Sequence, residues 1–401
     1  MEVIAEVDEI PLDKISIIPV DLNSFASVKK FTDEVNDFRL DRPLDRLVCN
    51  AAVYQPSLSY AKWSEDNIEQ QFQINFLSHF LMISRFIPAL KLAEKARVIM
   101  VGSVTGNDNT VGGGGVYPIA NLRALEGLKS GMKNPIAMAD GRVFNGAKAY
   151  KDSKLAIMML SNILHEKYNR ATGIAFSSIY PGCIASSPLF REKRPWFRKY
   201  FPVFMKYITG GYVGEEEAGQ RLFQVISDGR CTRSGVYWSW NGGPREGRDQ
   251  SLKTDGAIIG AGGAGGDWDS IYENDQSDKV RDFETTADLF RYATRVTGAT
   301  WEEARSYRSP CPTLRVISAA TTLIEKREDL EYERMMRKKA AEGQSLDGLV
   351  STSFAINDLE HTTEKTNEEE KGDEGAKRQD MRSAALAPSF DPVSGGSQLA
   401  F

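Results

Sequence analysis

The sequence has few residues of the kinds that build disulfide frameworks and metal sites. Its 401 residues include four cysteines, with no CxxC pair among them, and only three histidines. Disulfide scaffolds and zinc sites both need sets of cysteines or histidines at suitable spacing. We therefore expect no metal site and no disulfide framework, and a reducing compartment fits this composition better.

Long apolar runs and an excess of positive charge are also missing. The apolar stretch HFLMISRFIPAL is interrupted by Arg85, so we expect no transmembrane helix. The first residues, MEVIAEVDEIPLDK, have neither an apolar signal core nor the Arg- and Ser-rich character of a transit peptide. The formal net charge of −5 argues against nucleic acid as a partner, because binding to phosphates needs a basic face.

The sequence does contain an alternation of β-rich and helical segments up to about residue 242. Five runs predict strands: ISIIPVDL, LDRLVCNAAV, ARVIMVGSV, TGIAFSSIYPG and SGVYWSW. The segments between them with helical spacing are SVKKFTDEVNDF, a long stretch from Ser64 to Leu90 with Ser64 as candidate cap, and AYKDSKLAIMMLSNILHEKY. This rhythm predicts an α/β fold with a doubly wound, mostly parallel Rossmann-like sheet.

Other regions depart from this rhythm. Residues 107–144 form a glycine-rich excursion within the main domain, 1–242, and such long loops are usually functional or disordered. Beyond that domain we expect a Gly-rich insertion at residues 243–277 and a C-terminal helix at 278–300. A charged helical extension, 301–342, and a disordered tail, 343–401, should follow.

In a doubly wound domain, ligands bind at the carboxyl ends of the strands.

Tyr150 and Lys154 lie four residues apart in the segment GAKAYKDSKLA. On a helix, this spacing puts both side chains on one face, about 6 Å apart at Cβ. A nearby ammonium favours the phenolate, so we expect it to lower the pKa of the tyrosine and make it a general acid near neutral pH. Ordinary surface pairs share this spacing, so the interpretation depends on other residues.

Further motifs follow in order along the predicted elements. The triplet NAA (Asn50, Ala51 and Ala52) ends a strand, Asn75 lies in the next helix, and Ser103 ends the following strand. The dipeptide Pro181-Gly182 follows the strand after Tyr150 and Lys154. This order resembles the short-chain dehydrogenase/reductase family.

Longer phrases narrow the resemblance. VCNAAVY, VGSVTGN, KAYKDSK, IYPGCIA and SGVYWSWN are similar to the light-dependent NADPH:protochlorophyllide oxidoreductases, as is the excursion before Tyr150. The resemblance implies an NADPH-dependent oxidoreductase of chlorophyll biosynthesis in the plastid (chloroplast) of photosynthetic cells. Its reaction would be the light-driven reduction of the C17=C18 double bond of protochlorophyllide to chlorophyllide.

The resemblance also assigns catalytic roles. Tyr150 matches the proton donor, and Lys154 matches the lysine that lowers its pKa and binds the nicotinamide ribose of NADPH. Ser103 lies where the family has Ser or Thr. Asn75 would hold a water of the proton relay.

Binding roles follow in the same way. Asp21 matches the aspartate that contacts the adenine ring, and the other matching cofactor residues are Asn50, Ala51, Ala52, Pro181 and Gly182. Thr105, Tyr180 and Cys183 match the pigment pocket. Without the resemblance, Asp21 is interpreted as an acid near a helix N-terminus and Cys183 as a small buried apolar residue.

The segment REKRPWFRKYFPVFMKYITGGY, residues 191–212, is rich in aromatic and basic residues. Such a segment suits a flat apolar pigment that carries a carboxylate, or a membrane surface. An amphipathic helix packed on the domain is the alternative. The resemblance favours a lid over protochlorophyllide and a contact with other subunits or with plastid membranes.

The resemblance begins late in the family's fold. The family opens with a strand, a TGxxxGxG turn that approaches the pyrophosphate, a helix and a second strand. No counterpart is present, and ISIIPVDL corresponds to the third strand, which then has no neighbour to pair with. We expect a fragment of a longer protein whose transit peptide lies outside this sequence; an inactive copy is the alternative.

Two other functions fit the same residues. A short-chain reductase acting on a carbonyl compound would use Tyr150, Lys154, Ser103 and Asn75 equally well, although the excursion and YPGCIA argue against it. A non-catalytic pigment-binding paralogue would keep the pocket without the glycine turn.

Overall fold

The computed structural model describes residues 15–209, 211–241 and 268–301. The expected tail, 343–401, lies outside these ranges, as do almost all of the expected helical extension, 301–342, and most of the Gly-rich insertion, 243–277. By internal contacts the chain divides into one unit of residues 1–114 and 118–315 and another of residues 115–117 and 316–401. The fold below is that of the first unit.

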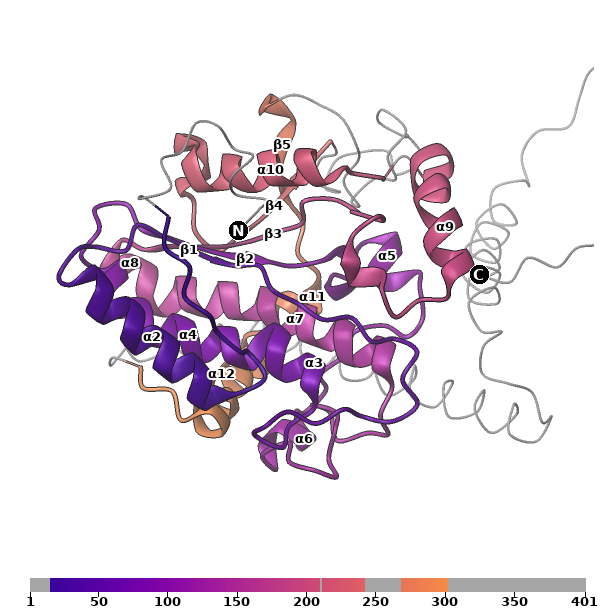
Figure 1. Cartoon of the computed structure of the whole chain (residues 1–401), viewed down its shortest axis with the longest axis horizontal. Coiled ribbons are helices and arrows are strands. Elements are labelled where there is room, and N and C mark those ends of the chain that lie inside the picture. Colours follow the sequence, from indigo (N-terminus) through magenta and orange to yellow (C-terminus); the bar gives the residue numbers. More distant parts are fainter. Residues whose placement is uncertain (1–14, 210, 242–267, 302–401) are drawn as a thin grey trace, which may run out of the picture. The chain divides into compact units, whose positions relative to one another are not determined.

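A five-stranded sheet forms the centre of this unit (Figure 1). In chain order its strands are β1 (Arg46–Cys49), β2 (Arg97–Val101), β3 (Ala175–Ile179), β4 (Val236–Trp240) and β5 (Ile271–Asn274). They are adjacent in that same order; β1 to β4 are parallel and β5 is antiparallel to β4. The mostly parallel sheet confirms the predicted fold class.

Helices cover both faces of the sheet, as Figure 1 shows. One face carries α10 (Glu215–Ser227). The other face carries α2 (Phe25–Arg39), α4 (Ser78–Leu90), α7 (Gly146–Leu164) and α12 (Phe283–Thr297). Parallel strands need such cover because both of their faces are buried.

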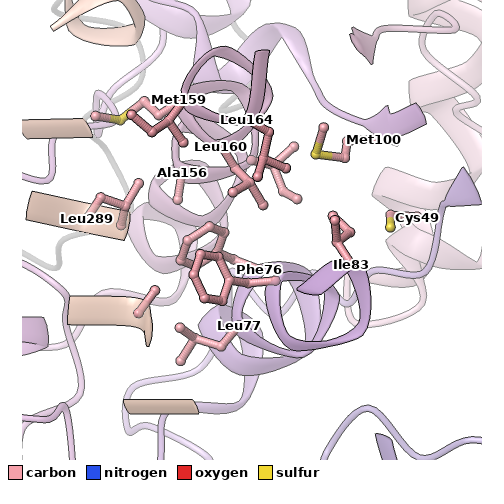
Figure 2. Close-up of a cluster of buried hydrophobic side chains, with 14 of the residues drawn as sticks. Cys49, Phe76, Leu77, Ile83, Met100, Ala156, Met159, Leu160, Leu164 and Leu289 are labelled. Carbon is pink, nitrogen blue, oxygen red and sulfur yellow. The ribbon is translucent and has the colours of Figure 1, made fainter. Parts of the chain in front are cut away.

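The larger core lies between the sheet and the α4–α7 layer. Phe76 and Ile83 lie on the side of their helix that faces Leu160 and Leu164 of α7, as Figure 2 shows. A smaller cluster on the α10 face includes Ile99, Ile179, Val225 and Trp240. Burial of these side chains positions α7 beneath the carboxyl ends of β2 and β3.

Short helical segments continue or connect these elements. The long helices are extended by α3 (Gln70–Phe72), η2 (Gln73–Leu77), η4 (His165–Asn169) and α8 (Arg170–Thr172). The turn η3 (Val104–Gly106) lies just before the excursion, which contains α5 (Val111–Gly114) and α6 (Glu126–Lys129). The remaining segments are η5 (Pro188–Phe190), α9 (Pro195–Phe204), η6 (Met205–Thr209), η7 (Gly229–Thr232), η8 (Trp268–Ser270) and α11 (Asp278–Arg281).

Three local predictions need correction. Residues 15–21 form no strand, because no described strand lies beside them to complete a ladder. The long helix begins after Glu69, and Ser64 is not its cap. The Glu69 carboxylate accepts hydrogen bonds from the backbone N–H groups of Gln71 and Phe72. The Ser64 hydroxyl instead bonds to the Gln73 side chain and to the N–H of Ile68. Strand β5 lies in a range expected to be an insertion, and its apolar residues are too few to reveal it.

Candidate active site

Tyr150 and Lys154 lie on successive turns of α7, and both side chains are buried. The ammonium of Lys154 is 5.7 Å from the centroid of the Tyr150 ring, so the two groups share one face of the helix. Lys154 Nζ donates to the carbonyl oxygen of Val101, the last residue of β2, at 2.8 Å. The pair therefore lies at the carboxyl end of the sheet, where the parallel fold places ligands.

Burial dominates the protonation of both groups. It raises the pKa of Tyr150 well above its usual value, and the neighbouring Tyr54 adds to the rise while a hydrogen bond with Ser103 opposes it. Burial also lowers the pKa of Lys154 to about 8. The expected lowering of the Tyr150 pKa by Lys154 is not found in this structure, because burial is the largest influence on the phenol and raises its pKa.

Ser103 lies two residues after the end of β2 and is buried next to Tyr150. Its Oγ lies 2.9 Å from Thr105 Oγ1 and accepts from the Thr105 backbone N–H, which caps η3. Ser103 and Thr105 thus form one hydroxyl pair. That pair can pass a hydrogen bond to the Tyr150 phenol.

Asn75 lies in the π-helical turn η2 and is fully buried. Its Oδ1 accepts from the Val53 N–H at 2.8 Å, and its Nδ2 donates to the Val53 carbonyl and to Ser153 Oγ, each at 3.0 Å. Both of its amide hydrogens are therefore occupied. In this structure Asn75 joins the loop after β1 to α7, three residues from Tyr150.

The loop after β1 carries the NAA triplet. Asn50 and Ala51 are exposed and Ala52 is half-buried, all at the carboxyl end of β1. The Ala51 carbonyl accepts a hydrogen bond from Nε2 of His79 at 2.9 Å. Burial lowers the pKa of His79 to about 4, so the ring is neutral near pH 7. His79 was not anticipated from the sequence, because a single histidine on an apolar helix gives no distinguishing signal.

The segment after β3 brings together the residues expected to bind pigment and cofactor. Gly182 has φ +114, and a Cβ at this position would overlap Val213, so the tight approach requires glycine. Arg221 of α10 donates to the Pro181 carbonyl at 2.8 Å and fixes this turn. Burial raises the pKa of both Tyr180 and Cys183; Cys183 in turn raises the pKa of Tyr150, and Tyr150 raises that of Tyr180.

A cavity of about 260 Å³ opens between the strand ends and α10. Residues from three parallel strands or their following loops line it, among them Asn50, Val101 and Pro181. Ile184 and Ser187 line the same cavity and were missed, because they follow the Pro-Gly motif without a pattern of their own.

Asp21 stands apart from these residues. It is exposed, and its carboxylate accepts from the N–H of Asn23 just before α2. Within the described residues, no hydrogen bond or ion pair joins it to another predicted site residue. Its observed contacts are those of an acid near a helix N-terminus.

An aromatic wall begins at Tyr150. The Tyr54 ring packs on the Tyr150 ring with centroids 4.6 Å apart, and Phe190 meets Tyr54 edge-on at 6.0 Å. Phe197 and Phe201 of α9 stack on each other at 4.6 Å, and Phe201 lies 5.1 Å from Phe190. The wall extends the site from α7 to α9.

The excursion is fastened to α7 on both sides of Tyr150. Lys148 Nζ donates to Asp152 at 2.6 Å, to Asp140 at 2.8 Å and to the Asn121 carbonyl at 2.7 Å. Asp152 Oδ1 in turn accepts from the Asn121 N–H at 2.9 Å. The ion pairs are buried, so this Lys148 latch holds residues 121–140 against the helix that carries the phenol.

The described residues contain no group of acidic, histidine and cysteine side chains suited to a metal ion. None of the described helices combines the length and apolar character needed to cross a bilayer.

Comparisons with known proteins place these features in context. A short chain dehydrogenase family model matches residues 1–139. The chain is 46% identical over 231 residues to a protochlorophyllide reductase of Avena sativa, covering 56% of this chain and 73% of the relative. It is 50% identical over 235 residues to protochlorophyllide reductase A, chloroplastic, of Arabidopsis thaliana, covering 58% of this chain and 57% of the relative.

The similar solved structures are more distant. A protein from Mycobacterium paratuberculosis matches with a TM-score of 0.44 at 18% identity, covering 71% of this chain and 76% of that one. The NADPH-bound carbonyl reductase from chicken fatty liver matches with a TM-score of 0.38 at 17% identity, covering 64% of this chain and 81% of that one. Likeness at this level supports no conclusion about chemistry.

The chain spans less than three fifths of the length of its Hordeum vulgare, Oryza sativa and Arabidopsis thaliana relatives, at 59%, 56% and 57%. It spans 73% of the length of the Avena sativa relative, at 46% identity. The chain therefore belongs to the protochlorophyllide reductase family.

Proposed function

We propose that this chain performs the light-driven, NADPH-dependent reduction of the C17=C18 double bond of protochlorophyllide, giving chlorophyllide. The observation that carries the proposal is the buried Tyr150 phenol, hydrogen-bonded to Ser103, beside the Lys154 ammonium and against the aromatic wall. A planar pigment that stacks on Tyr54 would lie next to this phenol. Because its relatives carry the name chloroplastic, we place the reaction in the plastid.

The residues present fit the nicotinamide end of NADPH. The cavity at the strand ends is lined by the polar side chains of Asn50 and Ser187, and the Pro181-Gly182 turn brings backbone close to it. Lys154 Nζ bonds to the carbonyl of Val101, a residue that lines this cavity, and its ammonium is suited to a ribose hydroxyl. When bound, NADPH supplies the hydride for one carbon of the double bond.

The chain's own residues supply the proton for the other carbon. The raised pKa of Tyr150 keeps the phenol protonated before reaction, as a proton donor requires. After transfer, the resulting phenolate would be stabilised by Ser103 and by the Lys154 ammonium. Asn75 contributes by fixing α7 to the NAA loop, rather than through a free amide hydrogen.

We also propose that α9 forms a contact with membranes or with a second copy of the chain. Its Trp196, Tyr200 and Val203 side chains are exposed, and Arg198 and Lys199 lie on the same helix. Exposed aromatic and basic side chains on one helix suit an interfacial surface.

The test is titration of the chain with protochlorophyllide and NADPH in the dark, followed by illumination. We expect an absorbance shift on binding and chlorophyllide formation in light. Tyr150→Phe should keep the shift and lose about 100-fold or more in photoreduction, the usual contribution of a general acid.

Other outcomes favour the alternatives. Turnover of ketones without a pigment shift would indicate a carbonyl reductase. A shift without photoreduction would indicate a pigment-binding paralogue. Wild-type photoreduction by Tyr150→Phe would refute the assigned acid.

A further inference from the structure

Lys193 lies two residues before α9 and contacts two rings of the aromatic wall. Its Nζ is 5.6 Å from the centroid of the Tyr54 ring and 5.3 Å from that of Phe197. Tyr54 is the ring that packs directly on Tyr150. The ammonium is therefore one ring removed from the proposed proton donor.

The charge of Lys193 has no carboxylate partner among the residues that the structure describes. Its side chain is half-buried, and burial lowers its pKa. The two aromatic rings replace the lost hydration of the ammonium only in part, because a cation–π contact is weaker than a salt bridge with a desolvated carboxylate. An anionic group of a ligand would complete the site.

We propose that Lys193 binds the carboxylate of a planar tetrapyrrole whose ring lies along Tyr54, Phe190 and Phe197. This inference rests on the proposed function and adds a specificity determinant to it. The aromatic wall can stack on any flat apolar ring, whereas the Lys193 ammonium forms an ion pair only with a ligand that carries a free carboxylate. Lys193 would therefore select the free acid of the pigment over an ester of the same ring.

Other lysines of the same segment provide matched controls. Lys199 and Lys206 also lie over aromatic rings, each 5.6 Å from the centroid of a tyrosine, Tyr200 and Tyr207 respectively. Both tyrosines are exposed, at 58% and 71%, and neither ring contacts the wall that begins at Tyr150. Removal of Lys206 takes the same charge from this segment without touching the proposed site or α9.

The experiment compares protochlorophyllide with its methyl ester, titrated in the dark against the full chain and followed by the absorbance shift. We expect the wild type to bind the free acid at least tenfold more tightly than the ester, because a charge-assisted hydrogen bond is lost with the ester. Lys193→Gln should remove this preference and leave affinity for the ester unchanged. Lys206→Gln should retain the preference, and Lys193→Arg should retain most of it.

Equal binding of acid and ester by the wild type would overturn the role of Lys193 while leaving the proposed function intact. The role of Lys193 would also be overturned if Lys193→Gln kept the preference for the free acid over the ester, or if that variant lost binding of both pigments. An absence of any shift with either pigment would overturn the proposed function, and this inference with it.

Discussion

At the scale of single residues, burial sets the chemistry of the site more than local charge does. Tyr150 and Lys154 lie where a helical spacing of four puts them, yet the ammonium does not make the phenol more acidic. Each group is instead pushed toward its neutral form by removal from water. A neutral phenol suits a proton donor, but a neutral lysine would not suit a phenolate partner.

This conflict gives a prediction for pH. Because burial lowers the pKa of Lys154 to about 8, the ammonium is lost as pH rises through that value, and at pH 9 about one molecule in ten retains it. We expect NADPH affinity to fall about tenfold between pH 7 and 9, measured by cofactor fluorescence. Lys154→Arg keeps its charge over this range, so its profile should be flat; a flat wild-type profile would contradict the role of the ammonium.

At the scale of elements, α7 carries the phenol and also anchors the excursion. Asn121 is held through both of its backbone groups, by Lys148 and by Asp152, one turn apart on the helix. The excursion is further packed by Leu122, Leu125 and Leu128, which are all buried. A segment that the sequence marks only as a long glycine-rich loop is thus a fixed part of the site.

Breaking this latch should loosen the excursion. Lys148→Met leaves the buried carboxylates of Asp140 and Asp152 without their common cation, which typically costs about 3–5 kcal/mol. We expect that loss in urea unfolding, with faster hydrogen exchange over residues 121–140. Lys129→Met, exposed on α6, should change the free energy of unfolding by less than about 0.5 kcal/mol. Equal stability of the two variants would show that the latch contributes nothing.

At the scale of the whole described unit, the larger core and the functional groups lie in different regions. The α4–α7 face holds the larger core, which is completed from far along the chain by α12. The strand ends, the cavity and the aromatic wall hold the functional groups. Figure 1 shows α12 and α9 at separate parts of the unit.

Stability and ligand binding should therefore be separable. Leu289→Ala removes a side chain that is 1% exposed on α12 and should lower the free energy of unfolding by about 2–5 kcal/mol. Below the unfolding transition, pigment affinity should stay at the wild-type value. Glu284→Ala, exposed on the same helix, is the control for stability. A weaker pigment shift in folded Leu289→Ala would mean that α12 is coupled to the site.

The sequence by itself determined the fold class and the order of the site motifs, because strand and helix periodicity and the Tyr-x-x-x-Lys spacing are local properties. Tertiary structure decided everything that depends on neighbours across the chain. Residues 15–21 have apolar β-rich character but no strand beside them, and β5 has little pattern but pairs with β4. Burial, with a smaller contribution from neighbours such as Tyr54, raised the pKa of Tyr150 against expectation, and long-range packing brought Tyr54 against Tyr150 and Lys193 against Tyr54.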